Sequence, residues 1–369
     1  MFPGQRGTDA PDADYVNVGD DWPILAADVN NTGRRANSGI SEVPTTRWRV
    51  TSGRPFDAGA VVEDGMVFAG TEDGQVLAVD EATGEVAWKT EVDARRLVEP
   101  VASGDGIVVA GRGDGFLSVL SRDDGSLAFA VDSGETRAVT EAPTVNDGVC
   151  YVPVDVQSGD QTRGRLVAID LEAGDKEWEL DFPSPISTPA LSDGELYVGT
   201  VDGTLVSVDS RRVERNRIAR TEGNVTCPPT VVDGVVYCGG MNGVVHAFDT
   251  RNTGRTWTTQ LQRPVRASPA VDEKSVYAMD MGGTVVRINR RSGETAWEFQ
   301  TAPVTTARSI SLVGEIVYVP TDRGVVGIDK NTGSERWQWS GGNVNHSAPA
   351  VANGTVYLTS TEGDVVAVS

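Results

Sequence analysis

Few residues of this chain belong to the types that carry out catalysis or bind metal ions. The 369 residues include three cysteines, Cys150, Cys227 and Cys238, and two histidines, His246 and His346. No CxxC pair occurs and the histidines lie 100 positions apart, so a Cys/His metal site is not expected. Three cysteines cannot form a disulfide framework, and neither histidine stands in a motif that suggests a Ser-His-Asp triad. We therefore predict no catalytic residues and no metal site.

The charge of the chain narrows the range of partners. Lys and Arg number 32 and Asp and Glu number 53, which gives a formal net charge of −21. A surface this acidic repels phosphate backbones and anionic lipid headgroups, so we expect no nucleic-acid partner and no membrane-surface role. No run approaches the roughly 18 apolar residues of a membrane span. The N-terminus has no apolar signal-peptide core, which predicts a cytoplasmic protein as given, or an extracytoplasmic one if it was trimmed from a precursor.

An internal repeat predicts the fold. A short apolar strand ending in Asp or a small polar residue recurs, and its last residues are Asp80, Ser121, Asp170, Asp209, Asp249, Asn289, Asp329 and Ser369. Successive copies are 39 to 49 residues apart, and most are 40 apart. Turns such as Asp73-Gly74 and Asp202-Gly203 separate short apolar strands within each copy. Four short strands per copy are typical of a propeller blade, so we predict an all-β, eight-bladed β-propeller of four-stranded antiparallel blades.

The ends of the repeat array predict how the ring closes. The last copy stops at Ser369, after its third strand, whereas TTRWRV around Trp48 has the pattern of a fourth strand placed before the first full copy. We expect this N-terminal strand to complete the C-terminal blade, because closure hides both open sheet edges. The chain is thereby divided into an N-terminal arm, residues 1–40, and a single propeller, residues 41–369. We expect the closed ring to be a monomer.

The fourth strand of most copies carries a large aromatic residue. Its ring is expected to fill the gap between neighbouring blades, a structural role that we favour over stacking on a cofactor or sugar. These residues are Trp48, Trp88, Phe129, Trp178, Trp257, Trp297 and Trp337. The fourth copy has SRRVERNRIAR instead, which predicts a polar, irregular outer strand over residues 213–219. The third copy is nine residues longer at Gln157–Arg165, either a binding loop or a solvated loop without a role.

A candidate ligand site comes from the start of each first strand, because in a propeller these strands line the central channel. Aligning the copies on their first-strand prolines places Asp57, Arg96, Glu141, Arg266, Arg308 and His346 at the upper mouth. Three arginines and a histidine in one ring would suit an anionic small molecule or an acidic peptide. In the alternative, the arginines pair with Asp57, Glu141 and other acids and only neutralise the channel.

The repeat frame PAVxDGxVYxGxxDGxxxAxDxxTGxxxW resembles the quinoprotein-type repeat of the PQQ-like β-propeller family, and ASPAVDEKSVYAMDMGGTVVRINRRSGETAWEF matches it closely. The leader DWPILAADVNNTGR is similar to the arm of archaeal members. Many carboxylates with only four lysines also resemble proteins of salt-loving archaea, so we expect a halophilic, acidic protein. The family comprises quinone-dependent alcohol and sugar dehydrogenases and non-catalytic propellers, among them the lipoprotein that assists outer-membrane barrel assembly.

The resemblance implies two functions between which the cysteines discriminate. The dehydrogenases resemble one another in two adjacent cysteines over the quinone and a Glu/Asn/Asp set for calcium. Here Cys227 and Cys238 flank the Asp233-Gly234 turn only as diagonal neighbours, outside disulfide range. We therefore expect a non-catalytic binding or scaffold module, without a cofactor, for a protein or anionic small-molecule partner at the upper face. The alternative is a PQQ-dependent alcohol or sugar dehydrogenase that holds PQQ with calcium.

Overall fold

A computed structural model describes most of the chain after residue 20. The described residues are 21–22, 26–35, 39–56, 58–92, 97–103, 107–112, 116–132, 139, 141–252, 254–304, 308–342 and 348–369. Three residues of the predicted channel mouth, Asp57, Arg96 and His346, lie outside these ranges.

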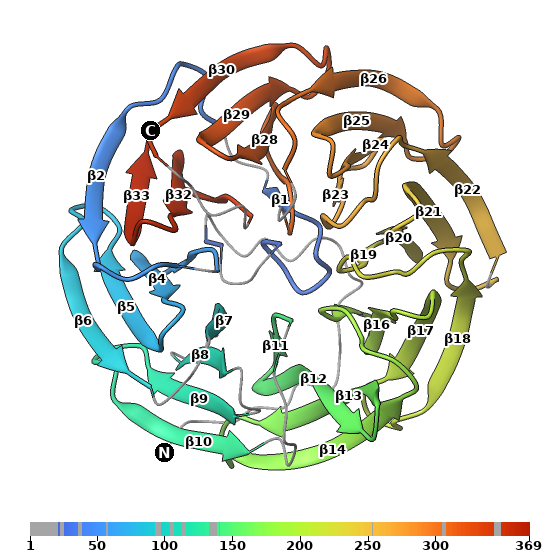
Figure 1. The fold of residues 1–369 in the computed structure, drawn as a ribbon, viewed down its shortest axis with the longest axis horizontal. Coiled ribbons are helices and arrows are strands. Elements are labelled where there is room, and N and C mark those ends of the chain that lie inside the picture. The colour runs from blue at the N-terminus through green and yellow to red at the C-terminus, as the bar shows by residue number, and fades with distance from the viewer. Residues whose placement is uncertain are drawn as a thin grey trace.

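The described strands form eight sheets, which stand radially around a central channel (Figure 1). We number the sheets in chain order and give the strands of each from the channel outwards. Sheet I consists of β3 (Val61–Glu63), β4 (Met66–Gly70), β5 (Gln75–Asp80) and β6 (Val86–Glu91), and sheet II of β7 (Leu97–Ser103), β8 (Ile107–Arg112), β9 (Phe116–Ser121) and β10 (Leu127–Asp132). Sheet III consists of β11 (Thr144–Asn146), β12 (Val149–Ser158), β13 (Gln161–Asp170) and β14 (Asp175–Phe182), and sheet IV of β15 (Ala190–Ser192), β16 (Glu195–Gly199), β17 (Thr204–Asp209) and β18 (Arg215–Arg220).

The remaining sheets include both ends of the array. Sheet V consists of β19 (Thr230–Val232), β20 (Val235–Gly239), β21 (Val244–Asp249) and β22 (Gly254–Gln260), and sheet VI of β23 (Ala270–Val271), β24 (Ser275–Met279), β25 (Thr284–Asn289) and β26 (Thr295–Gln300). Sheet VII consists of β1 (Arg34–Arg35), β27 (Ser311–Val313), β28 (Ile316–Thr321), β29 (Gly324–Asp329) and β30 (Glu335–Ser340), and sheet VIII of β31 (Ala350–Ala352), β32 (Thr355–Thr359), β33 (Asp364–Val368) and β2 (Thr46–Thr51).

Sheet VII corrects the predicted fold class. The prediction of uniformly four-stranded, antiparallel blades is wrong here, because β1 of the arm adds a fifth strand that runs parallel to β27. Arg34 lies opposite Leu312 and Arg35 opposite Val313. The innermost strand of a blade has one free edge with unpaired main-chain groups, and the arm pairs with that edge.

Sheet VIII joins the two ends of the described chain. Strand β2 pairs antiparallel with β33, from Thr46 opposite Val368 to Thr51 opposite Asp364. The Thr45 and Ser369 main chains exchange hydrogen bonds of 2.9 and 3.0 Å. This pairing confirms that the N-terminal strand completes the C-terminal blade, and it gives the outer edge of β33 a hydrogen-bonded neighbour.

Blade tryptophans bind four of the sheets to the next one along the ring. An indole N–H donates to the main-chain carbonyl that follows the third strand of the next sheet: Trp48 to Glu81, Trp88 to Arg122, Trp257 to Arg290 and Trp297 to Lys330, at 2.8 to 2.9 Å. Each ring also lies over the glycine of the same turn. A Cβ on Gly84 would come within 2.7 Å of Trp48. That glycine is therefore required by the ring as well as by its positive φ of 75°.

The outer strand of sheet IV is polar, as predicted, and is paired along its length. Strand β18 pairs with β17 from Thr204 opposite Arg220 to Val208 opposite Arg215, with a register shift between Leu205 and Val206. The outer strands of sheets I, V and VI have the same kind of shift, so this irregularity is not peculiar to sheet IV. Most side chains of β18 are exposed and Ile218 is buried, and an outermost strand with one solvated face is compatible with a polar sequence.

Candidate functional site

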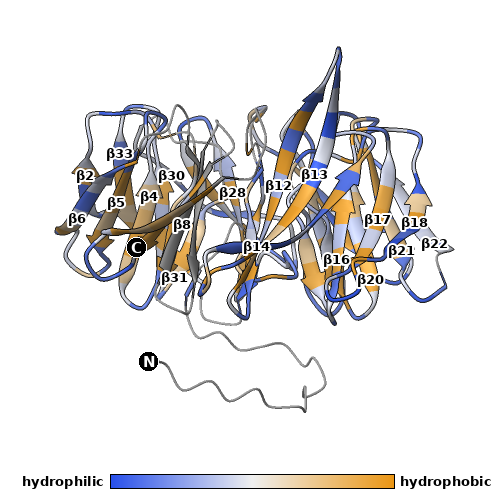
Figure 2. Ribbon diagram, turned by 90° about the horizontal axis from the view of Figure 1, so that it is seen from below, coloured by the Kyte–Doolittle hydropathy of each residue, from blue (hydrophilic) through white to orange (hydrophobic). Residues whose placement is uncertain are grey.

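The two faces of the propeller carry different strand-to-strand turns. The turns between second and third strands lie on the face that we call upper. The face that we call lower carries the turns after first and third strands (Figure 2). Buried apolar residues fill the space between adjacent sheets, for example Val245, Ala247 and Val286 between sheets V and VI. The accessible surface therefore consists of the two faces, the channel and the outer wall formed by strands such as β6 and β18.

The arm occupies the lower end of the channel, where it crosses four sheets (Figure 1). Main-chain N–H groups of the innermost strands donate to arm carbonyls: Leu191 to Val29, Val231 to Asn30, Val271 to Thr32 and Leu312 to Gly33, at 2.6 to 3.0 Å. These donors would face the channel unpaired without the arm. The arm is thus an integral part of the ring.

Two polar residues hold the arm in place. The Asn31 side-chain amide donates to the carbonyls of Pro189 and Pro229, at 3.2 and 3.0 Å, and only 1% of Asn31 is exposed. Asp28 accepts from the Thr32 main chain at 2.9 Å and lies 3.7 Å from the Arg35 guanidinium. Burial raises the pKa of Asp28 against the opposing effect of Arg35. The arm therefore bridges sheets IV and V through Asn31, in addition to the direct contacts between their innermost strands.

At the upper mouth, the structure brings together two of the predicted site residues. The Arg308 guanidinium of sheet VII lies 3.2 Å from the Glu141 carboxylate of sheet III. These sheets stand on opposite sides of the ring, so the ion pair crosses the mouth. Both side chains remain partly exposed, at 31% and 26%. Arg266 is exposed. A complete cationic ring of Arg96, Arg266, Arg308 and His346 stays a prediction.

The insertion in sheet III is an ordered hairpin. Strands β12 and β13 pair over ten positions, from Val149 opposite Asp170 to Ser158 opposite Gln161, with only Gly159 and Asp160 between them. Its tip rises above the turns of the other sheets (Figure 2). The predicted position of the extra residues is confirmed, but they belong to a paired hairpin and not to a loop. The alternating run VPVDVQ gives the period-two signal of a strand that continues past Val154.

The three buried cysteine thiols do not form a reactive centre in the described residues. All three cysteines are free and buried, and burial raises the pKa of Cys227 to about 12. The Cys227 sulfur accepts a hydrogen bond from the Gly239 main chain at 2.8 Å. Burial also raises the pKa values of Cys150 and Cys238. Because the thiolate is the nucleophile, these thiols are inert at neutral pH.

The described residues do not fit the quinone and calcium of the dehydrogenase alternative. In the ranges given above, no three His, Cys, Asp or Glu side chains gather as ligands for a metal ion. Cys227 and Cys238 both belong to the region of sheet V, but they are free and fully buried, so neither sulfur is accessible to a quinone. We derive no chemistry through this cofactor.

Comparisons with known proteins agree with the repeat pattern. The family described as outer membrane protein assembly factor BamB matches residues 42–216 and 212–369. The BamB of Yersinia pestis is 30% identical over 172 residues, 42% of this chain and 42% of that protein. The BamB of Nitrosomonas eutropha is 32% identical over 142 residues, 37% of this chain and 32% of that protein. The chain thus spans less than half the length of these curated relatives.

Solved structures share the architecture at low identity. BamB from Moraxella catarrhalis superposes with a TM-score of 0.72 and 18% identity, covering 89% of this chain and 98% of that one. Quinohemoprotein alcohol dehydrogenase from Comamonas testosteroni superposes with a TM-score of 0.77 and 15% identity, covering 96% of this chain and 81% of that one. These likenesses show the fold alone. Within the described ranges, no helix has the length and apolar character needed to cross a membrane.

Proposed function

Because the chain belongs to the PQQ-like propeller family described as outer membrane protein assembly factor BamB, we propose that it is a non-catalytic scaffold that holds a protein partner on its upper face. The relatives are named as assembly factors, and binding of another protein is the part of that role that we carry over. The observation that supports this proposal most is the β12–β13 hairpin, which presents an unpaired strand edge above the ring.

The hairpin has a free edge beside β13 among the described residues. Strand β14 pairs with β13 only as far as Gly164 opposite Phe182, so Gln161–Arg163 extend past it. On the other side, β11 reaches only Tyr151, and an isolated bridge joins Val154 to Val139. A free edge of this kind accepts an added strand from a partner through main-chain hydrogen bonds.

The register of the hairpin shows which main-chain groups point outward. Ser158 and Gln161 flank a two-residue turn, so they form the hydrogen-bonded pair closest to it. The next pair, Gln157 opposite Thr162, is then a non-hydrogen-bonded pair whose N–H and C=O groups point away from the hairpin. The outward N–H of Thr162 is therefore available to a strand added beside β13.

Site-specific photo-crosslinking in cells tests the docking face. A photoreactive residue at exposed Arg163 is expected to yield one dominant protein adduct, whereas the same probe at exposed Arg211 on the lower face should not yield it. Adding Thr162→Pro removes the outward donor, and we expect it to lower the adduct yield about tenfold. Equal labelling from both positions, or a yield that Thr162→Pro leaves unchanged, contradicts the proposal.

A separate measurement addresses the dehydrogenase alternative. The purified protein, incubated with PQQ and Ca²⁺, is expected to show no dye-linked oxidation of alcohols or aldoses above a heat-denatured control. Clear turnover that requires both additions would replace the scaffold proposal with an enzymatic one.

A further inference from the structure

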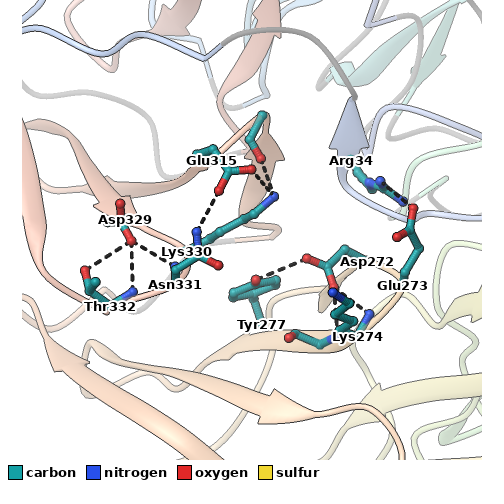
Figure 3. Close-up of polar contacts among 12 residues, drawn as sticks. Arg34, Asp272, Glu273, Lys274, Tyr277, Glu315, Asp329, Lys330, Asn331 and Thr332 are labelled. Carbon is teal, nitrogen blue, oxygen red and sulfur yellow. Dashed lines mark hydrogen bonds and ion pairs between the residues drawn. The ribbon is translucent and has the colours of Figure 1, made fainter.

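A cleft opens on the lower face between sheets VI and VII, and we name it the lower cleft. It is lined by Arg34 of the arm, by Glu273 and Lys274 of the β23–β24 turn, and by Glu315 and Lys330 of sheet VII (Figure 3). Arg287 of β25 also lines it. Its volume is about 220 Å³, and it continues along Glu273, Lys274 and Arg287 into a second hollow of about 430 Å³. The second hollow alone is within the usual size of small-ligand sites.

Arg287 departs from the rule of its own repeat. In every other described sheet with a blade tryptophan, the residue opposite that tryptophan is small: Ala78, Ala168, Ala247, Gly327 or Ala367. The ring explains this choice, since a Cβ on Gly327 would lie 2.3 Å from Trp337. Sheet VI has Arg287 opposite Trp297. A long cation at a position where packing favours a small residue points to a binding role.

The contacts of Arg287 orient its guanidinium without neutralising it. Its Nε donates to the hydroxyl of Ser275 at 2.7 Å, and its Nη1 donates to the carbonyl of Asn331 at 3.3 Å. Ser275 is 1% exposed and rigidly placed in β24. Among the described residues, Arg287 has no ion pair with a carboxylate. One edge of the planar guanidinium is therefore left for a ligand.

The acids of the lower cleft already have partners. Glu273 pairs with Arg34 at 3.3 Å, and Glu315 pairs with Lys330 at 2.7 Å. Asp272 accepts from the main-chain N–H groups of Lys274 and Ser275 at 2.9 and 2.7 Å. Figure 3 shows these contacts around the opening. The Lys274 ammonium and the Arg287 guanidinium thus have no ion-pair partner among the described residues, and the seven charged residues that line the cleft sum to one positive charge in a chain of net charge −21.

We infer that the lower cleft binds the carboxylate of an acidic peptide segment, with Arg287 as the anchor and Lys274 as the flanking cation. A singly charged carboxylate matches the guanidinium edge, whereas a phosphate dianion would be repelled more strongly by Asp272, Glu273 and Glu315. The cleft lies on the face opposite the β12–β13 hairpin, so the inference does not depend on the proposed scaffold role.

Fluorescence anisotropy of a labelled tetraglutamate peptide at fixed ionic strength tests this site. We expect saturable binding to the full chain and at least a tenfold weaker Kd for Arg287→Ala, which restores the small residue that the repeat uses elsewhere and so should fold. Arg287→Lys should lose less than Arg287→Ala, because it keeps the charge but not the planar fork. Lys274→Ala should weaken binding about threefold, and Arg211→Ala should change nothing.

The competing outcomes are distinct. The inference fails if no saturable binding is seen, if Arg287→Ala binds as the original chain does, or if Arg211→Ala loses as much. It also fails if inorganic phosphate displaces the peptide more effectively than glutarate at equal ionic strength. Crosslinking from Arg163 in the Arg287→Ala variant should remain unchanged, which separates this site from the upper face.

Discussion

Trp337→Ala is expected to lower the free energy of unfolding by about 3 to 5 kcal/mol, a large part of the total stability of a typical domain. Trp337 is 2% exposed and packs against Tyr318 with ring centroids 5.5 Å apart. Its indole N–H donates to the carbonyl of Ile40 at 2.7 Å, so the arm supplies the acceptor that a turn supplies in other sheets. The substitution leaves a cavity and a buried carbonyl without its donor.

Trp297→Ala is the matched control for this prediction. Trp297 makes the equivalent bond to Lys330 at 2.9 Å, but it is only partly buried and its acceptor lies in an ordinary turn. We expect a clearly smaller loss, measured for both variants by guanidinium unfolding followed by circular dichroism. Equal losses of unfolding free energy in the two variants would mean that the bond from Trp337 to the arm adds no extra stability at the junction between sheets VII and VIII.

His246→Leu is expected to remove about 3 kcal/mol of pH-dependent destabilisation between pH 7.5 and pH 4. His246 is 3% exposed and stacks on Phe248, and neither ring nitrogen has a hydrogen-bond partner in the described part of the chain. Burial, with a smaller effect of Arg255, lowers the pKa of His246 to about 4. The ring is therefore buried in its neutral form.

The sign follows from proton binding. Below the ordinary histidine pKa of about 6.5, His246 binds a proton in the unfolded chain but not in the folded chain. The free energy of unfolding therefore falls as the pH drops toward 4. Below that value both states are protonated and this contribution is constant. Urea unfolding of the original chain and the variant at both pH values isolates the difference. Parallel pH profiles of the two proteins would show that His246 does not titrate in this window.

Strand content and ring closure could be predicted from the sequence because the four-strand unit repeats along the chain. Asp80 and its equivalents are spaced about forty residues apart, and the blade aromatic follows eight positions after such a residue, as Trp88 follows Asp80. Both regularities come from a module that recurs about every forty residues. The register agrees, since Ala78 lies opposite Trp88 as Ala367 lies opposite Trp48. A periodic signal is strengthened by each copy, so errors in single residues have little effect.

Features that occur once could not be predicted in the same way. The arm has no copy with which it can be aligned, and its bonds to Leu191 and Val271 join residues far apart in sequence. The ion pair between Glu141 and Arg308 likewise depends on the diameter of the closed ring. Arg287 was visible as the arginine of VRIN, where the other copies with a blade tryptophan have Ala or Gly, but its importance becomes clear only once Trp297 is seen opposite it.

The affinity of the crosslinked partner for a chain with a shortened hairpin tests the scaffold account most directly. Val154 and Arg165 lie opposite each other, so an Asn-Gly turn can replace Asp155–Gly164 and removes only the pairing of Gly164 with Phe182 from the rest of sheet III. Calorimetric titration is expected to give a Kd at least about tenfold weaker than that of the full hairpin, with Arg211→Ala unchanged. An unaltered Kd for the shortened chain, at unaltered unfolding midpoint, would contradict the account.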